Sequence, residues 1–286
     1  MSEKLTTLLE ILNYSANLLK EKKISDPRLN AELLMADALK CKRLDLYLDF
    51  DKPLQKSETE LFKSHLRRRM NNEPVQYITG KTNFYGYDIV VDKSVLIPRP
   101  DTEVLVENIL KDIKESGLQE INILEVGIGS GCIAIAVCKD LEKMNIKYKY
   151  KGIDVSETAI ELCRKNIELN KVNCIEIEKC DFIGLTEMNY DYVVSNPPYI
   201  PLNEYNELDL EVRDYEPKLA LTDNTDGLTF YKKFISMFNA GSAKYFLEIA
   251  YNAKPALEKM LNDNNIEKYR FVKDYNNNYR ILILEK

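Results

Sequence analysis

The sequence contains a single histidine, His65, among its 286 residues. That count excludes chemistry built on a pair or a larger set of histidines, including a multi-histidine metal centre. Three arginines follow at positions 67–69. We therefore expect His65 to lie on a solvated face of a helix, not in a site.

The six cysteines never occur with the Cys-x-x-Cys spacing of a redox or zinc motif. The first residues, Met-Ser-Glu-Lys, lack the apolar run of a signal peptide. No stretch approaches the roughly 18 consecutive apolar residues of a membrane span. These absences predict a reduced, cytoplasmic protein that does not contact a membrane.

An excess of positive charge is also lacking, because 46 acidic residues outnumber 40 basic ones and give a net charge of -6. A protein that binds duplex nucleic acid usually presents a basic surface, so direct nucleic-acid binding is not expected. The chain is 45% hydrophobic and 30% charged, which is typical of a folded globular protein with one large or two modest domains.

Residues 1–72 are predicted to form a small helical domain. Thr7 is followed three residues later by a glutamate, as in a capping box, and Ser57 opens a second such pattern. Asp26 stands before Pro27, which indicates an N-cap followed by proline at the first helical position. Each of these signals precedes an apolar pattern with helical spacing.

Residues 73–100 have a different pattern, rich in tyrosine, isoleucine and valine between turn residues, and are predicted to form a β-hairpin linker. The clearest strand signal lies at 85–91. Two prolines then flank Arg99 and fix the backbone there. We expect Asp101 to cap the helix that starts at Glu103.

Residues 101–286 alternate between short apolar strands and amphipathic helices. This alternation predicts an α/β fold: a Rossmann-like, doubly wound and mainly parallel sheet with helices on both faces. The last two apolar stretches, at 269–272 and 279–284, flank a turn-like run and are predicted to form a C-terminal antiparallel hairpin. Ligands of such a sheet bind outside the carboxyl ends of its strands.

A glycine-rich loop follows the first strand of this region and precedes a helix. Its third glycine comes two residues after the second, whereas the dinucleotide fingerprint has a spacing of three. A loop of this kind without a phosphate-binding lysine suits a ligand that carries adenosine but no pyrophosphate, and S-adenosylmethionine is the commonest. The predicted cofactor-binding residues of the loop are Gly127, Ile128, Gly129, Ser130 and Gly131.

Two further positions are predicted to bind the same cofactor. Asp154 ends the second strand, where a carboxylate can accept hydrogen bonds from both ribose hydroxyls. Asp181 and Phe182 follow the third strand and would place an acceptor and an aromatic ring near an adenine.

The strongest chemical signal is Asn196-Pro197-Pro198-Tyr199, directly after the fourth strand. Prolines have no backbone N–H, so this loop can direct carbonyl oxygens at a ligand without competing donors. Asn196 and Pro197 are expected to accept both hydrogens of a planar amide or amine nitrogen, and Tyr199 to stack on its plane. We predict Asn196, Pro197 and Tyr199 as catalytic, and all four residues as substrate-binding.

These motifs together resemble the PrmC/HemK family of class I S-adenosylmethionine-dependent methyltransferases, which modify a release-factor glutamine. Asn-Pro-Pro-Tyr alone also occurs in DNA amino-methyltransferases. The additional resemblance lies in Ile-Pro-Arg-Pro-Asp-Thr-Glu at 97–103, Glu-Val-Arg-Asp-Tyr-Glu-Pro at 211–217 and Asp-Gly-Leu at 226–228. The sequence departs from the family pattern at Glu125 (commonly aspartate), Phe182 (often tryptophan) and Ala250 (usually glycine).

The resemblance implies transfer of a methyl group to the side-chain nitrogen N5 of the glutamine in the Gly-Gly-Gln motif of a peptide-chain release factor. S-adenosylhomocysteine would be the second product. The helical domain would help to dock the release factor. By resemblance, the cofactor contacts Gly127, Gly129, Gly131, Asp154, Phe182 and Asn196, and residues 196–199 hold the glutamine.

Two alternatives remain open at this stage. A DNA adenine-N6 methyltransferase would flip a base into the same pocket, although the acidic net charge disfavours it. A non-catalytic module that binds S-adenosylmethionine and a release factor would not need the complete Asn-Pro-Pro-Tyr loop.

Overall fold

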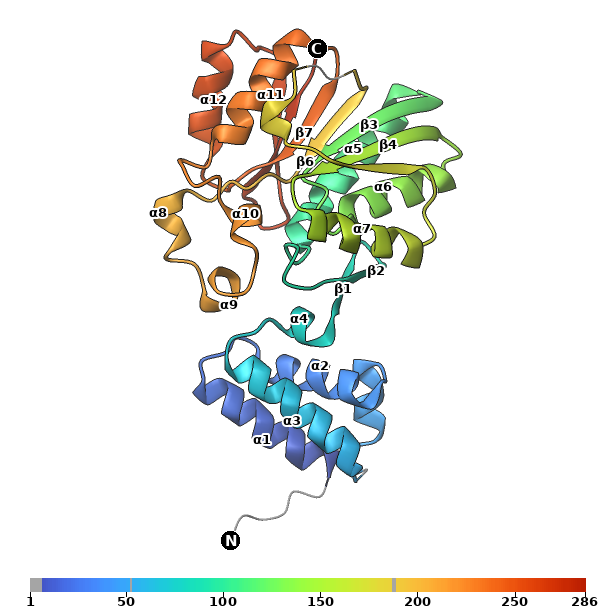
Figure 1. Cartoon of the computed structure of the whole chain (residues 1–286), viewed down its shortest axis with the longest axis vertical. Helices are drawn as coiled ribbons and strands as arrows, with labels where there is room; N and C mark the ends of the chain where they lie inside the picture. The colour runs from blue at the N-terminus through green and yellow to red at the C-terminus, as the bar shows by residue number, and fades with distance from the viewer. Residues whose placement is uncertain (1–6, 52, 187–188) are drawn as a thin grey trace. The chain divides into compact units, whose positions relative to one another are not determined.

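The computed structural model describes residues 7–51, 53–186 and 189–286. The chain divides into two compact units. The first lies within residues 1–81 and 209–215, and the second within 82–208 and 216–286. Figure 1 labels most of the helices and strands of both.

The first unit is helical, as predicted, and its helices enclose a small apolar core that includes Leu12, Leu34 and Phe62. The segment that joins it from the second half of the chain is the short helix α9. The elements are α1 (Leu8–Glu21), α2 (Pro27–Leu39), a 3-10 helix (Arg43–Leu48), α3 (Lys56–Met70), α4 (Val75–Thr79) and α9 (Leu210–Arg213).

Two of the three predicted helix starts are confirmed. Thr7 Oγ1 accepts from the Glu10 backbone N–H at 3.3 Å, and Glu10 Oε2 accepts from Thr7 N at 3.1 Å. Asp26 is the N-cap of α2 and Pro27 its first residue, as predicted, although Asp26 has a left-handed backbone (φ 45°) and its side chain makes no capping hydrogen bond. Ser57 is wrong by two residues, since the cap of α3 is Gln55.

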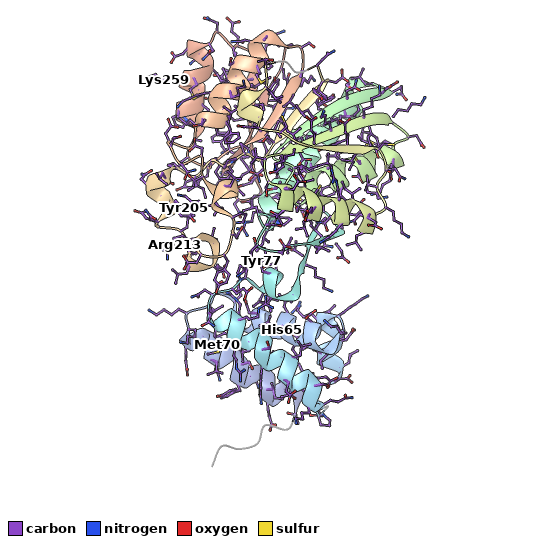
Figure 2. The ribbon with its side chains drawn as sticks, in the orientation of Figure 1. His65, Met70, Tyr77, Tyr205, Arg213 and Lys259 are labelled. Atoms are coloured by element: carbon purple, nitrogen blue, oxygen red, sulfur yellow. The ribbon has the colours of Figure 1, made fainter. Side chains whose placement is uncertain are left out.

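His65 is not solvated, so that prediction is wrong. The side chain lies on the inner face of α3 with Phe62 and Leu66, only 6% of the residue is exposed, and Nε2 lies 2.9 Å from Asp37 Oδ2. Figure 2 labels it on this helix. The arginines do not mark a solvated face either, because Arg69 is also buried, one turn further along the same face.

The hairpin at 81–90 is confirmed, but the region before it is a helix. Strands β1 (Lys81–Phe84) and β2 (Tyr87–Val90) pair with each other. Tyr85 and Gly86 between them both have positive φ, as the tight turn of a two-residue hairpin requires. The preceding α4 was not predicted; its apolar side chains are buried in the helical unit.

Helix α5 (Glu103–Ser116) follows a 3-10 turn over Pro100–Thr102. Asp101 therefore lies inside that turn, and the N-cap position of α5 is occupied by Thr102. The prediction that Asp101 caps α5 is wrong, because its carboxylate pairs instead with Arg280 at 3.1 Å.

The second unit contains a seven-stranded sheet in the order β5-β4-β3-β6-β7-β9-β8. The first five strands are parallel, and β9 runs antiparallel to β7 and β8, which confirms the predicted fold class and terminal hairpin. The strands are β3 (Glu120–Val126), β4 (Lys147–Asp154), β5 (Ile175–Lys179), β6 (Tyr192–Ser195), β7 (Lys244–Glu248), β8 (Tyr269–Lys273) and β9 (Tyr279–Leu284).

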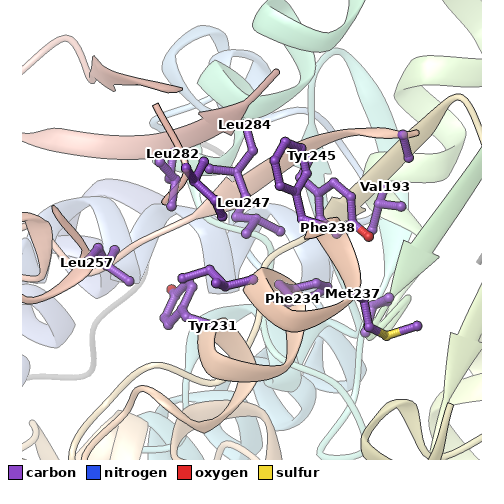
Figure 3. Packing of buried hydrophobic residues seen from close by; sticks show 14 of the residues in the cluster. Val193, Tyr231, Phe234, Met237, Phe238, Tyr245, Leu247, Leu257, Leu282 and Leu284 are labelled. Atoms are coloured by element: carbon purple, nitrogen blue, oxygen red, sulfur yellow. The ribbon is translucent and has the colours of Figure 1, made fainter. Parts of the chain in front are cut away.

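Helices pack on this sheet, and those nearest the strand ends position the loops discussed below. One apolar cluster joins the helices α11 and α12 to strands β6, β7 and β9 (Figure 3). In it Phe238 contacts Tyr245 edge-on, with ring centroids 5.3 Å apart. The remaining helices are α6 (Cys132–Lys143), α7 (Glu157–Leu169), α8 (Leu202–Tyr205), α10 (Lys218–Leu221), α11 (Thr229–Ala240) and α12 (Lys254–Asp263).

Within the ranges that the structure describes, every helix is too short or too polar to cross a membrane.

Candidate active site

A cavity of about 530 Å³ lies in the second unit, at the carboxyl ends of β3, β4 and β6. Its volume is within the range of small-molecule and cofactor sites. The wall is formed by the glycine loop, the ends of β4 and β6, and residues from the segments 94–102 and 217–230. This is the edge of the sheet where the sequence pattern predicts a ligand.

The glycine loop turns from β3 into α6 through three residues with positive φ, Gly127, Gly129 and Gly131. The backbone N–H groups of Gly127 and Ile128 both donate to the Ile153 carbonyl, which fixes the loop on the neighbouring strand. A side chain at Gly131 would lie 2.7 Å from Cys163 Sγ. Glycine is therefore required there for packing as well as for backbone conformation.

Asp154 lines the cavity at the end of β4. Its Oδ2 accepts from the Gly129 N–H and its Oδ1 from the Ser156 N–H, both at 2.9 Å. A carboxylate can accept about four hydrogen bonds, so lone pairs remain for two hydroxyl groups. The predicted ribose contact fits this geometry.

Asp181 and Phe182 also line the cavity, but with little of the aromatic ring free. Asp181 Oδ1 accepts from the Ile183 N–H at 2.9 Å and so caps a short 3-10 helix. Phe182 is 3% exposed and packs on Phe234 with ring centroids 4.4 Å apart. Little of Phe182 is therefore available to a ligand.

The charge of the cavity suits a cation better than a phosphate. Asp154, Asp181 and Asp223 line it, and Arg99 is the one basic residue among the described residues of its wall. Burial raises the pKa of Glu125, a fourth lining carboxyl, to about 8, although Tyr150 donates to it at 2.6 Å. Glu125 is therefore mostly neutral at pH 7, and three carboxylates remain.

Asn196 reaches the cavity wall directly after β6, together with Pro198. Its Nδ2 donates to Thr102 Oγ1 at 3.2 Å, which sets the orientation of the amide. The strand end beneath it is fixed because Ser195 Oγ donates to the Val126 carbonyl at 2.7 Å. Oδ1 of Asn196 is thus left as the acceptor, with no other hydrogen bond among the residues that the structure describes.

Pro197 and Tyr199 do not line the cavity, which corrects the expectation that the Tyr199 ring stacks on the substrate. The ring packs against the apolar cluster beside α11. The hydroxyl donates to Glu248 Oε1 at 3.2 Å. A buried phenol needs an acceptor, and the acceptor lies behind the loop, not in the cavity.

Glu248 ends β7 and is 1% exposed. Burial raises its pKa to about 7, while the Thr102 hydroxyl, Arg280 and Tyr199 each lower it. The Thr102 hydroxyl does not reach hydrogen-bond geometry with Oε2, which has no partner among the described residues. Thr102 also accepts a hydrogen bond from Asn196, and Tyr199 donates one to Glu248. Because Thr102 lies close to Glu248, the side chains that hold Asn196 and Tyr199 are neighbours.

Gly227 explains the Asp-Gly-Leu motif. Its φ is +77°, and a side chain there would collide with the Tyr199 carbonyl oxygen. Asp223 holds this turn by accepting from the backbone N–H groups of Gly227 at 3.0 Å and Thr225 at 2.8 Å. Although burial raises the pKa of Asp223, hydrogen bonds from Thr229 and Thr225 keep it well below its ordinary value.

The two remaining quoted motifs contact each other through an ion pair that is buried on the Glu216 side and partly exposed on the Arg99 side. Arg99 Nη2 lies 2.5 Å from Glu216 Oε1, and the Ile97 backbone N–H donates to Glu216 Oε2 at 3.4 Å. Glu216 is 5% exposed, and these donors are among the partners of its buried carboxyl group. This contact holds the residues that form one wall of the cavity.

Sequence reasoning missed four residues that support the site: Thr102, Asp223, Glu248 and Asn166. Asn166 is fully buried on α7, where its Nδ2 donates to the carbonyls of Val90 and Ser130, both at 2.9 Å. It therefore ties the glycine loop to β2. The available signal was an asparagine on the apolar face of a helix, where that residue type is disfavoured unless it has partners.

Family models match both parts of the chain. Residues 10–80 match the PrmC N-terminal domain, and residues 100–208 match the methyltransferase small domain. The first match covers the helical unit and the second covers the glycine loop, Asp154 and Asn196.

Relatives named release factor glutamine methyltransferase match nearly the whole chain. The one from Fusobacterium nucleatum is 37% identical over 97% of this chain and 78% of its own. Those from Chlorobaculum tepidum and Rhodopirellula baltica are 40% and 32% identical, over 80% and 98% of this chain and 80% and 96% of their own. The chain therefore belongs to the release factor glutamine methyltransferase family.

Proposed function

We propose that this enzyme transfers a methyl group from S-adenosylmethionine to the side-chain nitrogen N5 of the glutamine in the Gly-Gly-Gln motif of a peptide-chain release factor. The observation that carries the proposal is Asn196 at the wall of an acidic cavity: Thr102 holds its Nδ2, while Oδ1 has no partner among the described residues. The family supports a release factor as the protein substrate.

The residues present fit the methyl donor. The carboxylate of Asp154 would accept the ribose hydroxyls, the loop at 127–131 would face the adenosine and amino-acid portions, and Asp181 with Phe182 would border the adenine. The acidic wall favours a sulfonium over a phosphate. When bound, S-adenosylmethionine supplies an electrophilic methyl group and leaves as S-adenosylhomocysteine.

The chain's own residues activate the target nitrogen by accepting its hydrogens. An amide nitrogen is a poor nucleophile because its lone pair is delocalised. Asn196 Oδ1 at the cavity wall would accept one N–H group; Pro197 does not itself line the cavity, so its carbonyl would accept the second N–H only once the substrate is bound. With both hydrogens accepted, the charge that develops as the N–CH₃ bond forms and the S–CH₃ bond breaks is stabilised. The surplus proton then passes to water. Pro198 lines the same wall and restricts the orientation of the amide.

Incubation with methyl-labelled donor and a bacterial release factor tests the proposal. The wild-type enzyme should label the glutamine of the Gly-Gly-Gln peptide, located by mass spectrometry, and should not label a release factor in which that glutamine is alanine. Asn196→Ala should lower the rate by about 100-fold or more, as expected for loss of a transition-state acceptor.

Asn108→Ala is the matched control, because Asn108 lies on α5, its amide donates to the Val104 carbonyl within the helix, and it does not line the cavity. It should keep the wild-type rate. Label in an adenine-containing oligonucleotide would instead support the DNA alternative, and donor binding without any transfer would support a non-catalytic module. Full activity of Asn196→Ala would refute the role assigned to that residue.

We also propose a division of labour along the chain: residues 1–72 dock the release factor, 73–100 form a linker, and 101–286 carry the methyltransferase site. No direct contact with nucleic acid is needed for this reaction. Because release factors act where translation takes place, we infer that the enzyme acts in the cytoplasm.

A further inference from the structure

Behind the Asn196 loop lie two side chains, Tyr199 and Glu248, that the reaction described above does not use. Tyr199 and Asn196 belong to the loop, Thr102 precedes α5, and Glu248 ends β7. The Tyr199 hydroxyl donates to Glu248 at 3.2 Å, and the Asn196 amide donates to Thr102 at 3.2 Å. Thr102 and Glu248 lie close to each other. The hydrogen bonds of Asn196 and Tyr199 therefore end on two neighbouring side chains.

The burial of Glu248 at the end of β7 does not favour stability. Its side chain is almost fully buried, and Oε2 has no hydrogen-bond partner among the residues that the structure describes. A buried carboxyl group with an unsatisfied oxygen lowers the free energy of unfolding. Its presence here is therefore better explained by a role in function than by a role in stability. A phenylalanine at 199 with an apolar residue at 248 would fill the same space without polar atoms.

We infer that Glu248 is a positioning residue for methyl transfer: through Tyr199, and beside Thr102, it fixes the orientation in which Asn196 Oδ1 faces the target amide. This inference rests on the proposed function. Glu248 does not line the cavity, so it acts on the substrate only through the loop. The turn at Gly227 closes on the Tyr199 carbonyl and restrains the backbone, while Glu248 restrains the side chain.

The test compares Glu248→Ala, Glu248→Gln and Tyr199→Phe with the wild type, measuring kcat and KM for the release factor and calorimetric affinity for S-adenosylhomocysteine. Glu248→Ala and Tyr199→Phe should each lower kcat about tenfold or more, because small displacements of a positioning loop are costly in rate. KM and product affinity should stay within about threefold.

Glu248→Gln should restore most of the lost rate. The Gln oxygen can still accept from Tyr199, and a neutral side chain is a fair replacement because burial raises the pKa of Glu248 to about 7. In the double variant Glu248→Ala/Tyr199→Phe, the loss should equal that of the more severe single change, since both remove one contact. Losses that multiply would show that the two residues act independently and would overturn the inference.

A matched control lies elsewhere in the same sheet. Tyr192 is a buried tyrosine whose hydroxyl donates to Asp112 at 2.9 Å, and it does not line the cavity. Tyr192→Phe should keep kcat even if it lowers stability. If Glu248→Ala does not fold, Tyr199→Phe decides alone, and an unchanged kcat for it overturns the inference.

The outcomes separate this inference from the proposed function. A wild-type enzyme that labels no release factor refutes the function and the inference with it. A wild-type enzyme that labels the glutamine, with variants that retain wild-type kcat, refutes the inference alone.

Discussion

The glycine loop at 127–131 and the loop at 195–199 border the same cavity, but they are fixed by different means. The glycine loop is held by backbone hydrogen bonds to the adjacent strand, as between Gly127 and Ile153. The second loop is held mainly by side chains from distant parts of the chain, Thr102 and Glu248. Binding of the donor and orientation of the amide can therefore be disturbed separately.

The largest effect that sharpens this comparison is expected from Gly227→Ala. The new side chain would collide with the Tyr199 carbonyl and needs a positive φ, so the Asn196 loop must shift. A shift of about 1 Å can cost about 100-fold in rate. We expect kcat to fall by that order, with product affinity measured by calorimetry nearly unchanged.

Gly117→Ala provides the matched control for that variant. Gly117 also has a positive φ, +70°, but a side chain there meets no atom within 4 Å. Gly117→Ala should lower the free energy of unfolding by about 1 kcal/mol, because of backbone strain, and leave kcat unchanged. Equal losses of kcat in both variants would show that backbone strain, not the contact with Tyr199, causes the effect.

A smaller effect, on cofactor affinity instead of kcat, is expected from Asp154→Ala. Loss of a charged acceptor for two ribose hydroxyls should weaken S-adenosylhomocysteine binding by about 1–3 kcal/mol, which is roughly 5- to 150-fold in Kd. Calorimetric titration measures this. Glu157→Ala is the control, since Glu157 is exposed on α7 and does not line the cavity. Native affinity in Asp154→Ala would show that the ribose is held elsewhere.

The last effect concerns stability and not catalysis, through Glu125 beneath the glycine loop. Its pKa is about 8 in the folded chain against an ordinary value of 4.5, because it is buried. Below about pH 4.5 the acid is protonated in both states and costs nothing. Between about pH 5 and 8 the unfolded chain releases its proton first, so folding is increasingly penalised, by on the order of 1 kcal/mol per unit.

Glu125→Gln removes this penalty and retains an acceptor for Tyr150. Urea unfolding at about pH 5 and pH 8 should therefore show the variant gaining stability over the wild type as the pH rises. The gap should stop growing above the folded-state pKa. Parallel stability curves for the two proteins would mean that the carboxyl is already ionised at neutral pH in the folded state.

The sequence predicted the elements whose signals are local. Alternating apolar segments indicated the parallel sheet and the terminal hairpin, and the glycine spacing indicated the loop after β3. Three predictions made from neighbouring residues were wrong, at Ser57, His65 and Asp101. Two of these residues make distant contacts, Asp37 for His65 and Arg280 for Asp101, which no local pattern contains.

By itself the sequence determined the fold class and the residue types of the chemistry, because turns, strand periodicity and the donor-free Pro-Pro loop are properties of a few consecutive residues. The tertiary structure decided which side chains fix that loop. Thr102, Gly227 and Glu248 come together only because crossover connections return separate strands to one edge of the sheet. It also decided that Tyr199 faces a buried carboxyl and not the cavity, since a buried hydroxyl must find its acceptor wherever the packing supplies one.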